Sequence, residues 1–203
     1  PDVFFCKPKE PHYFATDFPH HRYVSNLEDY CSLFSTAASH QTAIGEGSAL
    51  YLRSNVAVPN ILRQIPTARF IVMFRNPVDL AQSMFRQAVF DGWENVSEFE
   101  DAWEMQDSRR SGINLPKKCL DHRLLLYREI ASIGSQSERL LMHVHRDQVL
   151  PIFFEDFVYD TKLVYAEVCR FLGISENIDN INFTPHNKSK RHRIPWLGTV
   201  TKK

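Results

Sequence analysis

Two polar side chains in the middle of the chain have the types and the spacing to bind an anion together. Arg75 directly follows the apolar run Phe70–Phe74, and Ser83 comes seven residues after Asn76. At about 100° per residue, that spacing returns Ser83 to nearly the same helix face as Asn76. A guanidinium and a hydroxyl placed this way suit a phosphate or a sulfate. The alternative is that Arg75 forms a surface ion pair and Ser83 is a small residue on a packed helix.

A second pair, Glu10 and His12, has the chemistry for proton transfer. Both residues lie in Lys7–Phe14, a stretch whose two prolines exclude regular structure. A carboxylate or an imidazole held in a cleft can take a proton from an attacking hydroxyl. Charged residues around prolines more often form a solvated loop, so the residues by themselves leave both interpretations open.

The anion pair requires a strand, a sharp turn and a helix. Phe70–Phe74 is a continuous apolar run, which predicts a parallel strand in mid-sheet, covered on both faces. Asn76 as N-cap, Pro77 at the first helical position and Asp79 in the first turn predict a helix from Pro77 to about Val89. Free N–H groups at such a helix start favour anions, and ligands collect beyond the carboxyl ends of parallel strands.

The rest of the chain alternates between expected strands and helices. The strands are Pro1–Cys6, Thr42–Gly47 and Val149–Phe154, the last of them covered on both faces. The helices are Ser25 to about Phe34, opened by an S-x-x-E capping box, then Asn55–Ile65, a helix opened by the capping box Ser97-x-x-Glu100, Lys117–Ile133, Glu138–His145, and Thr161–Leu172, which Gly173 ends. Because a helix makes His143 and His145 diverge, we expect no metal site there with Asp147.

Composition excludes several classes of protein. The 203 residues fit one domain with a sizeable core, and 24 basic residues balance 24 acidic ones, so nucleic acid is not an expected partner. The chain has no apolar run of about 20 residues that would span a membrane, and it does not open with a signal peptide. Four scattered cysteines indicate free thiols in a reducing compartment, so we expect a cytoplasmic protein. Nothing in the sequence indicates an oligomeric state.

The run RNPVDLAQSMF resembles the 3′-phosphate-binding motif of sulfotransferases that use 3′-phosphoadenosine 5′-phosphosulfate (PAPS). That motif has an arginine at the end of a strand, then Asn/Asp-Pro, and a serine eight residues after the arginine, as Arg75 and Ser83 are here. The resemblance implies that Arg75 and Ser83 bind the 3′-phosphate, that PAPS is the sulfuryl donor and that no metal is needed. It also implies an α/β fold, a P-loop NTPase-like three-layer domain with a central parallel sheet and helices on both faces.

The segment around Glu10 resembles another part of the same family. A K-E-x-H-(F/Y)-F segment, preceded by PDV, occurs in bacterial and glycosaminoglycan-type sulfotransferases. The resemblance implies that Glu10 is the base for the acceptor hydroxyl, with His12 as its neighbour and the second candidate for that role. It also implies that Lys9 or Lys7 faces the sulfate or an acidic acceptor.

Glu46-Gly47-Ser48 resembles the family's E-K-(S/T)-P segment, whose residues border the active site. The resemblance implies that Glu46 and Ser48 contact the substrate. Gly47 stands where the family has lysine, and Ala49 where it has proline, so this segment supplies no catalytic cation. Without the resemblance, Glu46 is a strand-end carboxylate that accepts hydrogen bonds from a neighbouring turn.

The basic tail resembles the family's late loop, which folds over the 3′-phosphate and the adenosine. The run HNKSKRHRIPWLG carries the resemblance. It implies that Lys190, Arg191 and Arg193 contact the phosphate. A solvated terminus is the usual role of such a patch when nothing else is known.

The sequence begins after the position at which these sulfotransferases have their 5′-phosphosulfate loop. Neither G-x-x-x-x-G-K-[ST] nor G-x-G-x-x-G occurs in it. We therefore expect a single domain over residues 1–203 without its first strand-loop-helix, whether truncated, omitted or lost. Efficient catalysis is not expected without that loop.

The resemblance implies transfer of a sulfuryl group from PAPS to a hydroxyl or an amine of a small-molecule, lipid or glycan acceptor. Aromatic residues suggest a lipid, phenol or polyketide acceptor, whereas lysines suggest a polyanionic glycan. One alternative is a P-loop kinase-like phosphotransferase, since the acids after the strand in FFEDF resemble a magnesium ligand. The other is a non-catalytic nucleotide- or glycan-binding domain.

Overall fold

The computed structural model describes residues 2–178 and 181–184 and divides the chain into two compact units. Unit 1 comprises Pro1–Phe74 and Gly134–Phe183, and unit 2 comprises Arg75–Ile133 and Thr184–Lys203. That a single domain spans residues 1–203 stays a prediction. No helix in the described part of the chain is both long enough and apolar enough to cross a membrane.

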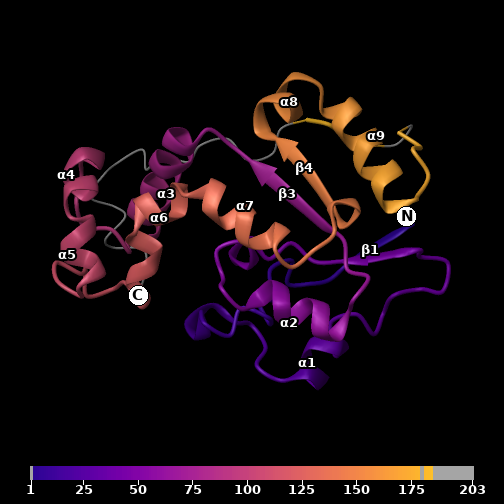
Figure 1. Cartoon of the computed structure of the whole chain (residues 1–203), viewed down its shortest axis with the longest axis horizontal. Coiled ribbons are helices and arrows are strands. Elements are labelled where there is room, and N and C mark those ends of the chain that lie inside the picture. Colours follow the sequence, from indigo (N-terminus) through magenta and orange to yellow (C-terminus); the bar gives the residue numbers. More distant parts are fainter. Residues whose placement is uncertain (1, 179–180, 185–203) are drawn as a thin grey trace. The chain divides into compact units, whose positions relative to one another are not determined.

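The strands of unit 1 form two parallel pairs (Figure 1). In the first pair, β1 (Val3–Phe5) lies beside β2 (Ala43–Gly45), with Phe5 opposite Gly45. In the second, β3 (Phe70–Phe74) lies beside β4 (Val149–Phe153). The predicted strands and their parallel direction are confirmed, with shorter bounds for β1 and β2. Because parallel strands end at the same edge, the loops that follow β1 and β2 start side by side.

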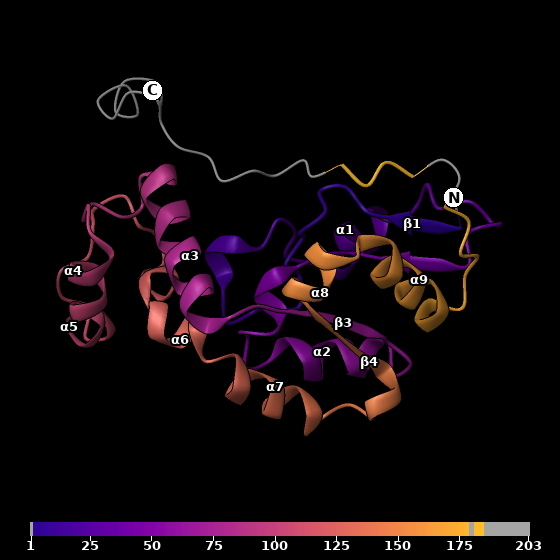
Figure 2. The ribbon, with the colours of Figure 1, turned by 90° about the horizontal axis from the view of Figure 1, so that it is seen from above.

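Helices lie on both sides of the β3–β4 pair (Figure 2). One side carries α2 (Ala57–Gln64) and α7 (Ile133–Leu141), and the other carries α8 (Phe154–Tyr159) and α9 (Thr161–Leu172). Val72 of β3 packs on the first side in a cluster with Val58 of α2 and Leu140 of α7. The helix-on-both-faces arrangement is therefore present around this pair.

The coverage of β3 itself differs from the prediction. Ile71 and Met73 are 41% and 49% exposed, although the apolar run predicted burial on both faces. In the described residues β3 has one neighbouring strand, β4, so it does not occupy a mid-sheet position. On the face of the strand pair that carries Met73, Ile152 of β4 is buried, whereas its pairing partner Met73 of β3 is exposed. The chain that covers this face therefore extends over β4 but not over β3.

Helix boundaries in unit 1 show which local signals decided them. In α9, Asp160 caps the first turn and Gly173 ends the helix with φ of 71°, as predicted. In α1 (Leu27–Ser32) the cap is Asn26, whose side chain accepts from the Asp29 N–H, so the predicted Ser25 capping box is wrong.

The predicted helix Glu138–His145 is wrong at both ends, because α7 covers Ile133–Leu141. His143 and His145 therefore lie outside the helix, contrary to the premise that made them diverge. His145 pairs with Asp147, with 3.2 Å between Nδ1 and Oδ2. Within residues 2–178 and 181–184, no three His, Cys, Asp or Glu residues form a group that could hold a metal ion.

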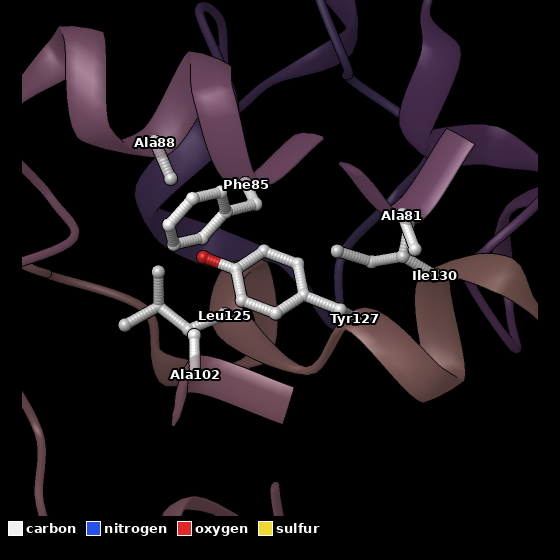
Figure 3. Close-up of a cluster of buried hydrophobic side chains, with 7 residues drawn as sticks. All are labelled: Ala81, Phe85, Ala88, Ala102, Leu125, Tyr127 and Ile130. Carbon is white, nitrogen blue, oxygen red and sulfur yellow. The ribbon is translucent and has the colours of Figure 1, made fainter. Parts of the chain in front are cut away.

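Unit 2 is a small helical unit built around α3 (Pro77–Asp91). Its other elements are α4 (Phe99–Glu104), α5 (Gln106–Arg110), a 3₁₀ helix at His122–Leu125 and α6 (Tyr127–Ala131). Ala81, Phe85 and Ala88 of α3 meet Ala102, Leu125, Tyr127 and Ile130 in one apolar cluster (Figure 3). The predicted Lys117–Ile133 helix is wrong, because the 3₁₀ helix and α6 replace it. The Ser97 capping box is also wrong, since Glu98 takes the N-cap position of α4 without a side-chain cap.

A buried ion pair lies beside this cluster. Both guanidinium Nη atoms of Arg109 donate to the Glu94 carboxylate, at 2.6 and 2.8 Å, and the Tyr127 hydroxyl donates to it at 2.9 Å. Burial opposes ionisation of Glu94, but the hydrogen bonds from Arg109, the Val96 N–H and Tyr127 outweigh it and lower the pKa of that carboxyl. This carboxylate is thus held in its charged form inside the unit.

Candidate active site

The parallel pairing of β1 and β2 brings the two loops of the predicted catalytic segment together. The Gly47 N–H, two residues past β2, donates to the Lys9 carbonyl oxygen at 2.7 Å. The His12 N–H donates to the Ser48 hydroxyl oxygen at 2.9 Å. These two bonds join segments that lie more than 30 residues apart in the sequence. The structure therefore places Glu10 and His12 beside Glu46 and Ser48, in unit 1.

Lys9, Glu10 and His12 form a short chain of ionisable groups. The Lys9 Nζ lies 2.6 Å from Glu10 Oε1, and the His12 Nε2 lies 3.5 Å from Glu10 Oε2. The Lys9 side chain is 73% exposed, that of Glu10 is 34% exposed and that of His12 only 12%. The Glu10 carboxylate therefore sits between a solvated cation and a mostly buried imidazole, with a partly open path to a ligand.

The imidazole of His12 is tuned toward its neutral form. Burial lowers the pKa of His12, the Glu10 carboxylate opposes this, and His21 and Lys9 add to the lowering. A neutral imidazole can accept a proton or orient a neighbouring carboxylate, whereas an imidazolium can only donate. Both Glu10 and His12 thus have the chemistry of the base predicted for this loop.

The backbone at His12 is unusual. Its φ is 51°, in the left-handed region that residues with a side chain rarely adopt. Two side-chain oxygens hold this turn, because Ser48 Oγ accepts from the His12 N–H and the Tyr51 hydroxyl oxygen accepts from the Phe14 N–H at 3.3 Å. Strained backbone of this kind persists where the surrounding structure fixes it.

Glu46 is the anchor for both of those oxygens. Its carboxylate accepts from Ser48 Oγ, from the Tyr51 hydroxyl at 2.6 Å and from the Tyr30 hydroxyl at 3.0 Å. Burial raises the pKa of Glu46, and the hydrogen bonds from Ser48, Tyr51 and Tyr30 offset only part of that rise. Burial and the facing Glu46 charge also raise the pKa of both tyrosines.

Sequence reasoning missed Tyr30 and Tyr51. They come from α1 and from a 3₁₀ helix at Ala49–Tyr51, and they reach Glu46 across 16 and 5 residues of sequence. Neither position belongs to a motif, so no signal in the sequence singled them out. Their role depends entirely on how the chain packs.

Gly47, which stands where the family has lysine, has a packing reason. A Cβ at this position would lie 3.1 Å from Cζ of the Phe5 ring and 3.6 Å from the Lys9 carbonyl oxygen. The first distance is tighter than normal van der Waals contact, so a side chain here would have to displace the ring of Phe5 at the end of β1. A side chain at Gly47 would therefore require the half-exposed ring of Phe5 to shift by a small amount.

The second predicted site, Arg75 and Ser83, lies in unit 2. Arg75 precedes the N-cap Asn76, and α3 runs without a break to Asp91, so the expected helical spacing to Ser83 is present. Both side chains are partly buried. That Arg75 and Ser83 bind one phosphate together stays a prediction.

The expected contribution of free N–H groups at the start of α3 is wrong. Pro77 has no N–H, the Asn76 side chain accepts from Val78 at 3.0 Å and Asp79 at 3.4 Å, and Leu80 donates to the Asn76 carbonyl. The N-cap thus satisfies the amides that would have faced an anion.

The remaining predicted residues, Lys190, Arg191 and Arg193, lie outside the described residues.

Two of the aromatic residues in the middle of the chain have a definite place in unit 2. Phe99 and Trp103 line a shallow pocket with Val78, Ala81 and Gln82 of α3 and with Glu100 and Glu104.

Comparisons with known proteins address the family and the fold of this chain. A family model described as "Sulfotransferase family" matches residues 11–177. Among solved structures, a sulfotransferase from Alicyclobacillus acidocaldarius matches with a TM-score of 0.76 and 26% identity, over 91% of this chain and 77% of that one. A sulfotransferase domain from the curacin biosynthetic pathway matches with a TM-score of 0.48 and 14% identity, over 73% of this chain and 44% of that one, and supports no inference. No curated protein matches.

The match to the bacterial enzyme over most of this chain shows the fold, and the parallel strands and flanking helices described above agree with it. The fold is α/β and P-loop NTPase-like, as predicted. The family model spans well over half of the 203 residues and includes His12, Glu46, Ser48, Arg75 and Ser83. The chain belongs to the sulfotransferase family, whose reaction is sulfuryl transfer.

Proposed function

We propose that this protein transfers a sulfuryl group from PAPS to a hydroxyl or amine of a small-molecule, lipid or glycan acceptor. The observation that carries the proposal is the Glu10 carboxylate, paired with a mostly buried His12 at the carboxyl edge of β1 and β2 in a chain of this family. Ligands of open α/β sheets bind at this edge.

In the proposed reaction Glu10 accepts the proton of the acceptor hydroxyl as the acceptor oxygen attacks sulfur. The new bond joins that oxygen to sulfur, the bond from sulfur to the donor's 5′-phosphate oxygen breaks, and adenosine 3′,5′-bisphosphate leaves. His12, held 3.5 Å from Glu10, orients the carboxylate and is the second candidate base. The Lys9 ammonium, 2.6 Å from Glu10, supplies positive charge beside the reacting sulfate.

Donor recognition is assigned to side chains in this proposal. Arg75 and Ser83 bind the 3′-phosphate, with Lys190, Arg191 and Arg193 as further phosphate contacts. The N–H groups of Val78 and Asp79 already donate to the Asn76 side chain, so the proposal gives the phosphate to the guanidinium and the hydroxyl and not to these two amides. Glu46 and Ser48 border the acceptor side of the site.

Calorimetric titration with adenosine 3′,5′-bisphosphate and with adenosine 5′-monophosphate tests the donor site. We expect the bisphosphate to bind more tightly, and Arg75→Ala to weaken it about 10- to 150-fold, the loss of one charge-assisted bond of roughly 1.5–3 kcal/mol. Arg86→Ala is the matched control, because Arg86 is an exposed arginine on α3, the helix that follows Arg75. Equal affinity for both nucleotides, or a preference for ATP with magnesium as a kinase would show, contradicts the proposal.

Turnover of PAPS by a protein that includes a 5′-phosphosulfate loop, with a panel of phenol, sterol, amine and glycan acceptors, tests the base. We expect Glu10→Gln to lower kcat by about 10²- to 10⁴-fold, the usual contribution of a general base. If Glu10→Gln and His12→Ala both leave kcat intact, the base is another group. Binding of the bisphosphate without turnover of any acceptor would instead favour a nucleotide-binding domain.

A further inference from the structure

Two hydroxyl groups connect Glu46 to the loop that carries Glu10 and His12. Ser48 Oγ donates to Glu46 and accepts from the His12 N–H, and the Tyr51 hydroxyl donates to Glu46 and accepts from the Phe14 N–H. Each hydroxyl uses both its donor and its acceptor capacity in this way. A third donor, the Tyr30 hydroxyl, contacts the same carboxylate but makes no hydrogen bond to the loop among the described residues. The ring of Tyr30 does pack on the loop, with ring centroids 4.6 Å from Tyr13 and 5.1 Å from Phe14, and Tyr30→Phe keeps that ring.

We propose that Glu46 is a positioning residue, which fixes the reactive geometry of Glu10 and His12 through Ser48 and Tyr51. This inference rests on the proposed function and gives Glu46 and Ser48 a role in holding the loop, in addition to their proposed place on the acceptor side of the site. The Glu46 charge orients both hydroxyl protons toward itself. The hydroxyl oxygens are then turned toward the two amide groups that the loop presents.

The backbone conformation of His12 explains why the loop needs to be anchored by Ser48 and Tyr51. Its left-handed backbone conformation is unfavourable for a residue with a side chain, so a loop without anchors would relax toward an extended form. The amides of residues 12 and 14 flank the His12 side chain, and holding both fixes the direction in which the imidazole points. A relaxed loop would move His12 away from Glu10 and toward water.

The hydroxyls of Ser48 and Tyr51 bridge Glu46 to the loop, whereas the Tyr30 hydroxyl does not, and this difference provides the test. Ser48→Ala and Tyr51→Phe each remove one bridge and leave the Glu46 carboxylate in place. Tyr30→Phe is the matched control, because it removes a hydroxyl from the same carboxylate without removing a bridge. Ser48→Thr keeps the hydroxyl and therefore the bridge, so the pKa of His12 should stay as it is in the natural protein.

The first readout is the pKa of His12, measured by NMR titration and assigned with His12→Gln. Glu10, Lys9 and His21 are the charged or titratable groups whose fields act on this imidazole, and Tyr51 meets it with ring centroids 6.4 Å apart. None of these charged groups is changed in the bridge variants. We expect Ser48→Ala, and more strongly the Ser48→Ala/Tyr51→Phe pair, to raise the pKa of His12 toward its ordinary value, since the loop opens to water. Tyr30→Phe and Ser48→Thr should leave it unchanged.

The second readout is turnover, if the proposed reaction is found. We expect the bridge variants to lose up to about 100-fold in kcat with little change in the KM for PAPS, as a displaced catalytic group does. An unchanged His12 pKa in the double bridge variant would overturn the inference, as would a response of Tyr30→Phe equal to that of Tyr51→Phe. The NMR readout needs no turnover. A shifted His12 pKa in the bridge variants, without activity of the natural protein, would therefore contradict the proposed reaction and leave the positioning role of Glu46 standing.

Discussion

Two carboxylates, Glu46 in unit 1 and Glu94 in unit 2, each accept a hydrogen bond from a tyrosine hydroxyl, yet their pKa values move in opposite directions. Glu94 is paired with the fully buried guanidinium of Arg109, so its pKa is lowered. Glu46 accepts from three neutral hydroxyl groups, and burial raises its pKa.

The comparison separates a structural carboxylate from one that serves a site. A cation at bonding distance compensates the buried charge of Glu94 and joins α5 to the chain that follows α3. Neutral donors leave the Glu46 charge only partly compensated, and this charge polarises the hydroxyls that hold the His12 loop. The tyrosine hydrogen bond that the two carboxylates share therefore conceals different electrostatic roles.

The largest difference between Glu94 and Glu46 should appear in the free energy of unfolding of variants at the two positions. Glu94→Gln leaves the Arg109 charge buried without its counter-ion, so we expect the free energy of unfolding to fall by about 3–5 kcal/mol in urea denaturation. Glu46→Gln should cost less, about 1–3 kcal/mol, since no buried cation is left behind. A double variant, Glu94→Gln with Arg109→Met, should lose less than the sum of its two parts. Equal losses for the two glutamine variants would erase the distinction.

A smaller difference should separate the two tyrosines. Tyr127→Phe removes one hydrogen bond to a charged group, worth about 1.5–3 kcal/mol, and should leave turnover and the His12 pKa unchanged in the folded protein. Tyr51→Phe should lower stability less, because its surroundings are more solvated, and should raise the His12 pKa. If Tyr51→Phe lowers the free energy of unfolding but leaves turnover and the His12 pKa unchanged, Glu46 has the same purely structural role as Glu94.

The smallest effect, and the one with opposite signs, is the pH dependence of stability. The folded-state pKa of Glu94 is lowered, so its contribution is present above about pH 4.5 and is lost as pH falls. That of Glu46 is raised, so its contribution is greatest below about pH 4.5 and is lost as pH rises through the folded pKa. The difference in unfolding free energy between the natural protein and each glutamine variant should follow these slopes. Parallel slopes would show that the two sites are electrostatically alike.

Local signals in the sequence predicted the elements whose ends are decided within one turn. The Asn76 cap with Pro77 predicted α3, and Gly173 predicted the end of α9, because a cap bond or a positive φ involves only near neighbours. The same logic failed where two candidates compete. Asn26 is one residue from Ser25, and only the actual path of the chain decides which one caps α1.

The motifs of the sequence, through their resemblance to a family, also predicted the candidate residues Glu10, His12, Glu46 and Ser48 of unit 1 and Arg75 and Ser83 of unit 2. Only the tertiary structure decided which residues of unit 1 meet. The parallel register of β1 and β2 brings Gly47 and Ser48 to the Lys9–His12 turn, and packing brings Tyr30 and Tyr51 to Glu46. Motifs report residue types along the chain, whereas burial, pKa shifts and hydrogen-bond relays arise only between segments distant in sequence.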